Sequence, residues 1–396
     1  MKQFFASLLL SLATVLLLSS CETGSSAPPP AGVKVAPGDG SVTLTWDMEP
    51  GVQYWLFSAA GDSVTPESCS SLPECKTIMS AVSPQVVSGL NNGTTYSFTI
   101  NGRIDGGPGG LGSASVSAVP RLAGTTWKAG AALGQNDLHG VTFGTTFLAV
   151  GRGGTMFSSA DGIAWAALNS VISADLNAAV YGSGNTSYLA AGAGGVMLRS
   201  DDELKTWTQA LTNTSNDLYA LAYNGSLYLA VGANGTLITS DDGANWTARY
   251  PGTSSHLYGV TYGNGLYVAV GAGGTLQTSS DGIAWQGATS QTTLDLKGVA
   301  YGAGIFVAIG DAGALITSTD GVTWTSQTPI ASSPAFNALV HGSQFIAAGN
   351  GGAIYTSPDG INWAMPSTGN ASLYAVTYGN HGYAAVGASG SNLVAY

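Results

Sequence analysis

Six aspartates recur at nearly even spacing along the chain, and each precedes a tryptophan. Such carboxylates could act as general acids or bases, or they could accept hydrogen bonds from backbone N–H groups in turns. The shared pattern is Ser-x-Asp-Gly-x-x-Trp, with a longer variant at Asp202. Because equivalent residues of successive repeats lie far apart, we expect a structural role. The pairs are Asp161 and Trp165, Asp202 and Trp207, Asp242 and Trp246, Asp281 and Trp285, Asp320 and Trp324, and Asp359 and Trp363.

These pairs belong to a repeat whose tryptophans, from Trp127 onward, are 38 to 42 residues apart. A period near 40 is typical of solenoids and propellers. The unit from 257 to 285 predicts four antiparallel strands divided by glycine-rich turns, at residues 257–262, 266–270, 275–279 and 283–286. Four such strands make one propeller blade.

The two ends of the array are complementary. The chain stops at Tyr396 after three strands of a last blade, whereas residues 124–127 read as a fourth strand without a blade of its own. We therefore expect seven blades, closed by pairing of residues 124–130 with 391–396. This pairing removes two open sheet edges that would promote aggregation.

The repeated pattern resembles the Asp-box, or bacterial neuraminidase repeat, over residues 124–396. It has one residue fewer between Asp and Trp than the family's usual spacing, and Leu204 stands where the family has glycine in the Asp202 repeat. The resemblance implies a β-propeller. The chain is also similar to propellers of photosystem II assembly factors, which would imply an assembly or scaffold role.

Asp-box proteins include sialidases and other glycosidases, so an enzyme must be considered. These enzymes use paired carboxylates, or a tyrosine with a glutamate, together with arginines that bind an acidic sugar. Glu203 is the only glutamate after residue 120, and Arg152, Arg199 and Arg249 fall on different strands or turns of different repeats. We expect no catalytic residues, no metal site and no cofactor. The alternative is a divergent glycoside hydrolase or lyase.

One variable position stands out within the repeat. It follows the first-strand leucine, or phenylalanine in one repeat, and precedes a Gly or Ala. If these side chains surround the channel mouth, their rings and amides suit a sugar or a peptide. Alternatively, they fill space between blades near the axis. The position is occupied by His139, Asn177, Tyr219, Tyr258, Lys297, Asn337 and Tyr374.

The first 20 residues read as an export signal, with one charge at Lys2 and an apolar stretch from Phe4 to Leu18. The following Cys21 completes a sequence that resembles the lipobox of bacterial lipoproteins, which implies lipid attachment to its thiol. Glu22 after the cysteine implies, by analogy, the outer membrane. An ordinary signal with an incidental cysteine is the alternative. Residues 21–31 are proline-rich and read as a tether.

Residues 32–120 predict a small β-sandwich. The segments GSVTLTW at 40–46 and VSGLNNGTTYSFTI at 87–100 resemble a fibronectin type III domain, which implies that Trp46 is the core indole and that Leu90 and Tyr96 form its tyrosine corner. Cys69 and Cys75, six positions apart in an exported chain, are expected to form a disulfide.

Composition limits the possible partners. Charged residues make up 8% of the 396-residue chain, the net charge is −11 and Gly occurs 57 times. Without a basic stripe to neutralise phosphates, we expect no nucleic acid partner. The sequence therefore predicts an all-β protein, a seven-bladed β-propeller at 121–396 after a fibronectin III-like β-sandwich, that binds a protein or a glycan and contacts the membrane through its lipid anchor.

Overall fold

The computed structural model describes residues 24–184, 187–329 and 335–396. The predicted export signal and Cys21 therefore lie outside the described residues. The chain divides into two compact units, one built mainly from Val42–Val87 and Gly93–Val119, the other mainly from Pro120–Tyr396. Within the described ranges, no helix is long and apolar enough to cross a membrane.

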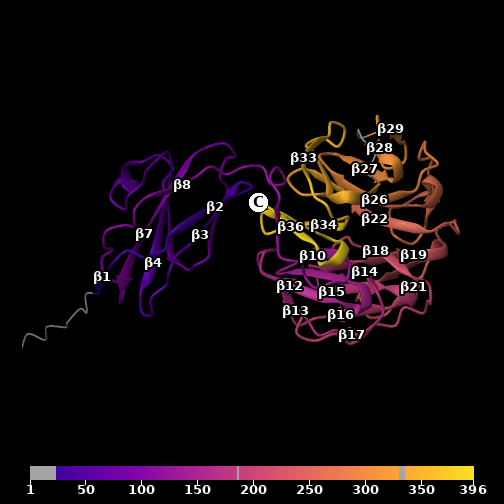
Figure 1. Cartoon of the computed structure of the whole chain (residues 1–396), viewed down its shortest axis with the longest axis horizontal. Helices are drawn as coiled ribbons and strands as arrows, with labels where there is room; N and C mark the ends of the chain where they lie inside the picture. Colours follow the sequence, from indigo (N-terminus) through magenta and orange to yellow (C-terminus); the bar gives the residue numbers. More distant parts are fainter. Residues whose placement is uncertain (1–23, 185–186, 330–334) are drawn as a thin grey trace, which may run out of the picture. The chain divides into compact units, whose positions relative to one another are not determined.

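The larger unit is a seven-bladed β-propeller, and each blade is a four-stranded antiparallel sheet (Figure 1). Blades 1 to 4 comprise β10 (Leu138–Phe143), β11 (Phe147–Gly151), β12 (Met156–Ser159) and β13 (Ala166–Ala167); β14 (Leu176–Gly182), β15 (Ser187–Gly192), β16 (Met197–Ser200) and β17 (Thr208–Gln209); β18 (Leu218–Tyr223), β19 (Tyr228–Gly232), β20 (Leu237–Ser240) and β21 (Thr247–Ala248); and β22 (Leu257–Gly263), β23 (Leu266–Gly271), β24 (Leu276–Ser279) and β25 (Gln286–Gly287).

Blades 5 to 7 have the same order, and the last is completed by β9 from the start of the unit. They comprise β26 (Leu296–Gly302), β27 (Ile305–Gly310), β28 (Leu315–Ser318) and β29 (Thr325–Ser326); β30 (Phe336–His341), β31 (Phe345–Gly349), β32 (Ala353–Ser357) and β33 (Ala364–Thr368); and β34 (Leu373–Gly379), β35 (Gly382–Gly387), β36 (Asn392–Ala395) and β9 (Lys128–Ala129).

A short 3₁₀ turn joins the second and third strands of every blade. Its middle residue has a positive φ, between 50° and 66°, which explains the glycines found there in four of the seven turns. The turns are η2 (Arg152–Gly154), η3 (Ala193–Gly195), η4 (Ala233–Gly235), η5 (Ala272–Gly274), η6 (Asp311–Gly313), η7 (Asn350–Gly352) and η8 (Ala388–Gly390).

The core of the propeller lies between neighbouring blades. One cluster joins Val268 and Leu276 of blade 4 to Leu296 and Phe306 of blade 5, and each of these side chains is at most 2% exposed. Burial of one such side chain contributes about 1.5–3 kcal/mol. Each sheet therefore depends on its neighbours for stability.

The first and last blades are also neighbours, with β10 beside β34 (Figure 1). β9 pairs with β36, where Lys128 lies opposite Val394 and Ala129 opposite Leu393. Trp127 packs near Tyr383, with ring centres 6.3 Å apart. The start of this unit thus completes the sheet at its end.

The fourth strands are shorter than the sequence suggests. β25 begins at Gln286, whereas we predicted a strand from Ile283. The backbone amides of Ile283 and Ala284 instead donate hydrogen bonds to Oδ1 of Asp281, at 2.8 and 2.9 Å. Amides bound to a carboxylate in this way cannot also pair with β24.

The smaller unit is built on two sheets. One has the order β1-β7-β4-β5 with β8 also on β7, and the other has the order β2-β3-β6. η1 (Ser68–Ser71) follows β4. The strands are β1 (Ser25–Ala27), β2 (Lys34–Gly38), β3 (Ser41–Thr45), β4 (Gln53–Ala60), β5 (Lys76–Ala81), β6 (Gln85–Ser88), β7 (Tyr96–Ile104) and β8 (Val116–Ala118).

Part of the predicted tether is a strand, so the interpretation of residues 21–31 needs correction. β1 pairs with one end of β7, Ser25 opposite Ile104 and Ala27 opposite Gly102. β8 pairs with the other end of β7. Together the two short strands cover an edge of β7 that would otherwise be open, since β4 occupies the opposite edge.

The residues expected to stabilise this unit lie as follows. Trp46 is 5% exposed and packs edge-on against Tyr54 at 6.0 Å, Leu90 is 7% exposed, and Tyr96 is the first residue of β7. Cys69 and Cys75 form the predicted disulfide, with Cα atoms 5.4 Å apart. The bond closes a loop beside β4, where Phe57 and Val64 are buried.

Candidate functional site

The first strand of every blade contains a β-bulge close to its start. At this point pairing with the second strand skips one residue. A bulge redirects the side chain of the unpaired residue. The skipped residues are those predicted as the ligand face: His139, Asn177, Tyr219, Tyr258, Lys297, Asn337 and Tyr374.

These seven bulges surround a common cavity of about 170 Å³. All of the predicted residues except Lys297 line it, as do the small residues that follow them in all seven blades. The need for small residues is steric. A Cβ on Gly140 would lie 2.9 Å from the Cα of Ala178, and a Cβ on Gly259 would lie 2.9 Å from the Lys297 carbonyl oxygen.

Aromatic rings gather on two sides of this mouth. Tyr219 and Tyr258 have ring centres 5.7 Å apart, and His256 lies 6.3 Å from the first and 6.1 Å from the second. A separate pair, His139 and Tyr374, is 5.6 Å apart across the boundary between blades 1 and 7. All five rings are half-buried, so each retains exposed surface for stacking.

The two asparagines of the ring have structural contacts. Asn177 Nδ2 donates to the Leu218 carbonyl oxygen at 3.0 Å, and Asn337 Nδ2 donates to that of Leu373 at 2.9 Å. Each amide therefore joins its blade to the next one. The contacts of these two side chains agree with the alternative interpretation, in which the side chain fills space between blades.

Lys297 holds its ammonium group over an aromatic ring. Its Nζ lies 3.7 Å from the centre of the Tyr258 ring, 2.9 Å from Asp295 Oδ2 and 4.0 Å from Asp311 Oδ2. An ammonium in this position combines cation–π attraction with two ion pairs. The mouth can therefore hold a cation.

A second ring, not predicted from the sequence, lies one residue before each first-strand Leu or Phe. Asp175 Oδ1 accepts a hydrogen bond of 2.7 Å from the amide of Gly153, in the turn of the preceding blade. In the same way, Asp217 accepts from the amide of Gly194, Asp295 from that of Gly273, and Asp137 from that of Ser389. His256 accepts from the amide of Asn234, and Ser372 from that of Gly351. The seventh position is Ala335. Asp recurs at this position in four repeats, and this recurrence could have revealed the second ring from the sequence.

Burial and charge shift several pKa values at the mouth. Burial, and then the nearby Asp217 carboxylate, raise the pKa of the Tyr219 phenol. Burial and Asp137 raise that of Tyr374. The backbone N–H of Gly273 and the Lys297 ammonium lower the pKa of Asp295. At neutral pH the phenols are uncharged and the carboxylate is ionised.

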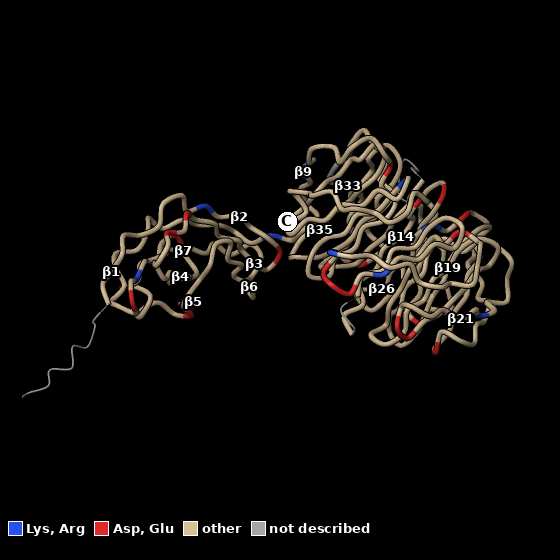
Figure 2. Tube along the Cα trace, turned by 90° about the horizontal axis from the view of Figure 1, so that it is seen from below, with Lys and Arg blue, Asp and Glu red and all other residues tan. Residues whose placement is uncertain are grey.

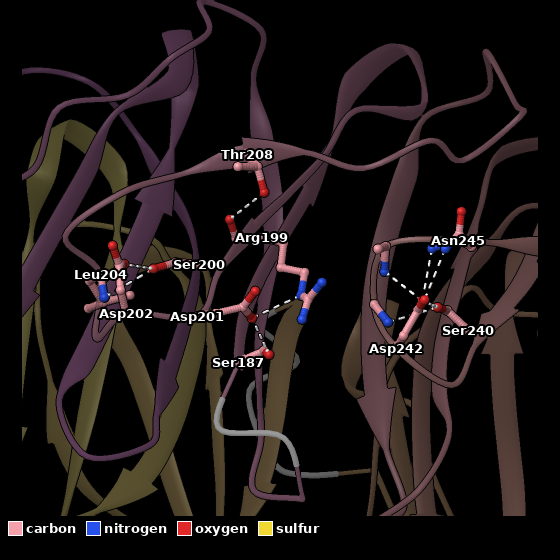
Figure 3. Close-up of polar contacts among 12 residues, drawn as sticks. Ser187, Arg199, Ser200, Asp201, Asp202, Leu204, Thr208, Ser240, Asp242 and Asn245 are labelled. Atoms are coloured by element: carbon pink, nitrogen blue, oxygen red, sulfur yellow. Dashed lines mark hydrogen bonds and ion pairs between the residues drawn. The ribbon is translucent and has the colours of Figure 1, made fainter.

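The Asp-box carboxylates lie at the opposite end of each blade. In blade 4, Leu257 at the mouth pairs with Gly271, whereas Ser279 of the box pairs with Tyr267, at the other end of β23. The boxes of blades 2 and 3 appear in Figure 3. The box aspartates therefore do not contribute to the mouth.

Each box carboxylate accepts hydrogen bonds from its own turn. Asp242 Oδ1 accepts from the amides of Ala244 and Asn245 at 2.8 and 2.9 Å and from the Ser240 hydroxyl at 2.9 Å (Figure 3). The Trp246 indole donates to the Gly243 carbonyl oxygen at 3.1 Å. Asp161, Asp281, Asp320 and Asp359 make the same contacts, and Trp165, Trp285, Trp324 and Trp363 repeat the indole bond.

The box of blade 2 departs from the others. Asp202 accepts from the amides of Lys205 and Thr206. Leu204 donates to Ser200 Oγ at 3.1 Å, the role that glycine has elsewhere (Figure 3). Leu204 has φ 70° and is 5% exposed. Its burial against the core around Trp207 offsets the cost of a left-handed conformation.

The box contacts predict an acid-sensitive propeller. Hydrogen bonds from Asn245, first its backbone N–H, hold the pKa of Asp242 well below the ordinary value. The ionised form therefore stabilises the fold fully above about pH 4, the unfolded value, and loses this contribution as pH falls further. We expect Asp242→Asn to lower the urea midpoint more at pH 7 than at pH 2.5. Asp241→Asn, which changes the exposed neighbouring carboxylate, is the control. Equal losses at both pH values would contradict this.

One hollow holds several acidic groups. It measures about 410 Å³ and is lined by Asp201, Asp202 and Glu203 together with Tyr181 and Lys205, among others. Asp202 is engaged by its box. Asp201 forms a 2.9 Å ion pair with Arg199 and accepts from Ser187 Oγ at 2.5 Å (Figure 3). Among the described residues, no three His, Cys, Asp or Glu side chains are placed to hold a metal ion.

Comparison with known proteins identifies the fold of the larger unit. No protein-family model matches the sequence, and no curated protein matches it. Solved propellers do match, each across 68% of this chain. They include YCF48 bound to D1 peptide (18% identity, 94% of that chain, TM-score 0.57), YCF48 from Cyanidioschyzon merolae (18%, 98%, 0.56) and a streptogramin B lyase (10%, 97%, 0.60).

At these identities the similarity concerns the fold alone. It supports the expected likeness to propellers of photosystem II assembly factors, because YCF48 is one. The same fold also occurs in a lyase and in the WD40 propeller of Doa1 (12% identity, TM-score 0.57). The chain is an all-β protein whose larger unit is a β-propeller similar in fold to YCF48.

Proposed function

We propose that this chain is a non-catalytic binding protein whose propeller recognises a partner at the mouth of its channel. The observation that carries the proposal is the ring of seven β-bulges. All seven blades place one variable side chain at the same edge, and all of these side chains except Lys297 line one cavity. Bulges often redirect side chains at sites of function.

The partner we propose is a segment of protein, with a glycan as the other ligand class. Of the similar structures, YCF48 is described as bound to a D1 peptide, which supports peptide recognition on a fold of this kind. Tyr219, Tyr258 and Tyr374 present half-buried rings next to hydrogen-bonding groups. Rings of this type stack on side chains and on sugars.

We further propose that the protein is exported and anchored by lipid on Cys21, at the outer membrane. The lipobox-like sequence supports the anchor, and the disulfide between Cys69 and Cys75 supports an oxidising compartment. The fibronectin III-like unit then acts as a stalk. Mass spectrometry of the mature protein tests this, since an unmodified Met1 terminus would contradict export and anchoring.

An enzyme of the Asp-box type, a glycoside hydrolase or a lyase, is the competing function. A propeller of the same fold is a streptogramin B lyase. Against this function, the box carboxylates are engaged by amides of their own turns. At the mouth, Asp175, Asp217 and Asp295 are each bonded to a different turn.

The experiment compares binding and turnover on one preparation. The full chain, purified in mild detergent, is screened on peptide and glycan arrays and on chromogenic glycosides. We expect binding without hydrolysis, weakened more than about tenfold by Tyr219→Ala combined with Tyr258→Ala. Tyr250→Ala is the control, because this side chain is 80% exposed and does not line the cavity. Hydrolysis that disappears on changing one propeller residue would overturn the proposal.

A further inference from the structure

The strand starts and turns around the mouth carry more carboxylates than cations. Charged residues are few and separated along the chain (Figure 2), which makes a local excess of one sign informative. Carboxylates in one ring produce a negative potential that attracts cations. The carboxylates are Asp137, Asp175, Asp217, Asp295 and Asp311, and the cations are Lys297 and Arg152.

Among the described residues, at least three of these carboxylates have one oxygen without a hydrogen-bond partner. Asp137, Asp175 and Asp217 each use Oδ1 for the amide of a neighbouring turn, and no described residue donates to Oδ2. The fixed oxygen holds each side chain in place. The free one can therefore accept a hydrogen bond from a ligand without first ordering the carboxylate.

Lys297 shows which chemical group this edge holds. Its ammonium lies over Tyr258 and is bound by Asp295. This ammonium belongs to the protein itself, and a cationic group of a ligand could make the same contacts. Tyr219 of blade 3, with its ring centre 5.7 Å from that of Tyr258, has Asp217 two residues before it, whereas His256 stands in blade 4 at the position that Asp295 has in blade 5. Blade 3 has a tyrosine and a carboxylate but no lysine of its own at this position.

From this arrangement we infer that the ligand of the propeller is an extended segment of a partner protein that carries lysine or arginine. Its cationic groups bind the carboxylates of the mouth and the faces of Tyr219 and Tyr258. Lys297 occupies one such position in the free protein and competes with the ligand for it. The inference rests on the proposed binding function and specifies the ligand class of the same mouth.

Charge separates this ligand from the alternatives. A neutral sugar gains from the rings but leaves the carboxylate oxygens without cations, and an anionic segment is repelled by them. Ion pairs at an exposed mouth weaken when salt screens them. Binding that falls steeply with salt therefore indicates a cationic segment.

The test uses a fluorescein-labelled octapeptide of alternating lysine and glycine, with matched peptides in which glutamine or glutamate replaces lysine. Anisotropy measures binding to the full chain in mild detergent. We expect the lysine peptide to bind about tenfold more tightly than the glutamine peptide and to lose affinity in 0.5 M salt. Lys297→Met, which retains the apolar stem, is expected to increase affinity about fivefold.

Two further variants complete the design. Asp217→Asn keeps an oxygen for the Gly194 amide but removes the charge, and we expect weaker binding of the lysine peptide. Lys205→Met, a lysine of the box turn at the other end of blade 2, is expected to change nothing. Unchanged or weaker binding by Lys297→Met would overturn the inference.

The outcomes also separate this inference from the proposed function. Equal or tighter binding of the glutamine or glutamate peptide, lost in the Tyr219 and Tyr258 double variant, overturns the cationic ligand and leaves a binding mouth. Binding of array glycans alone, lost in the same variant, has the same meaning. Absence of any mouth-dependent binding to peptides, arrays or glycosides overturns both.

Discussion

Deletion of residues 121–130 is expected to turn the propeller into an aggregating protein. Without β9, the strand β36 has no partner on its outer edge, and an unpaired edge readily pairs with other chains. The deletion also removes Ala123, which is fully buried, and Trp127. The side-chain amide of Gln344 loses the Ala123 carbonyl oxygen that it binds at 2.7 Å. A buried amide without its partner costs about 1–3 kcal/mol.

Size-exclusion chromatography and thermal unfolding measure this effect, and two point variants refine it. Trp127→Ala keeps the backbone of β9 but removes the half-buried indole and its 2.9 Å bond to the Gly124 carbonyl oxygen. We expect it to cost on the order of 3 kcal/mol. Lys128→Ala changes an exposed side chain in the same strand and serves as the control. A deletion product that is monomeric and melts cooperatively would contradict the importance of closure.

The propeller and its blade count were predictable because the repeat is local. Strands, turns and the box lie within about 40 residues, so each unit shows the same hydrophobic alternation and the same glycines. The incomplete last unit and the extra strand before Leu138 then indicate closure. This step needs only a count of strands, and it agrees with the pairing of β9 and β36.

Contacts between units were harder to predict. The variable position could be found because its residue differs among otherwise similar repeats. The bulge that redirects its side chain, however, depends on pairing with the second strand. The carboxylates that join neighbouring blades, such as Asp175, bind a turn 22 positions earlier in the chain. The strand β1 pairs with a segment more than 70 residues away. Nothing within Ser25–Ala27 itself indicates that partner.

Two sets of aspartates in the propeller have different structural roles. Box residues such as Asp281 fold back on their own turn, and their spacing to the next tryptophan makes them visible in the sequence. Mouth residues such as Asp217 instead use one oxygen for the turn of a neighbouring blade. The negative charge of the mouth thus arises from residues that also hold the blades together.

Gly263→Ala is expected to destabilise the propeller strongly, because the first strands of neighbouring blades lie very close together. A Cβ on Gly263 would lie 2.3 Å from the Cβ of Tyr301 in the next blade. Tyr301 cannot readily move, since its ring packs against Phe306 at 4.6 Å. The same contact recurs where Gly379 of blade 7 meets Phe143 of blade 1. One methyl group at such a contact forces neighbouring backbones apart.

Overpacking of this kind costs about 1–3 kcal/mol, and more where backbone must shift, so we expect the melting temperature to fall by about 5–10 °C. The matched control is Gly287→Ala in β25, where the nearest atom would be the flexible end of Gln277 at 3.5 Å. This control should leave the melting temperature nearly unchanged, because the added methyl group meets only ordinary contacts. If both variants melt alike, the spacing between first strands is not the constraint that selects glycine.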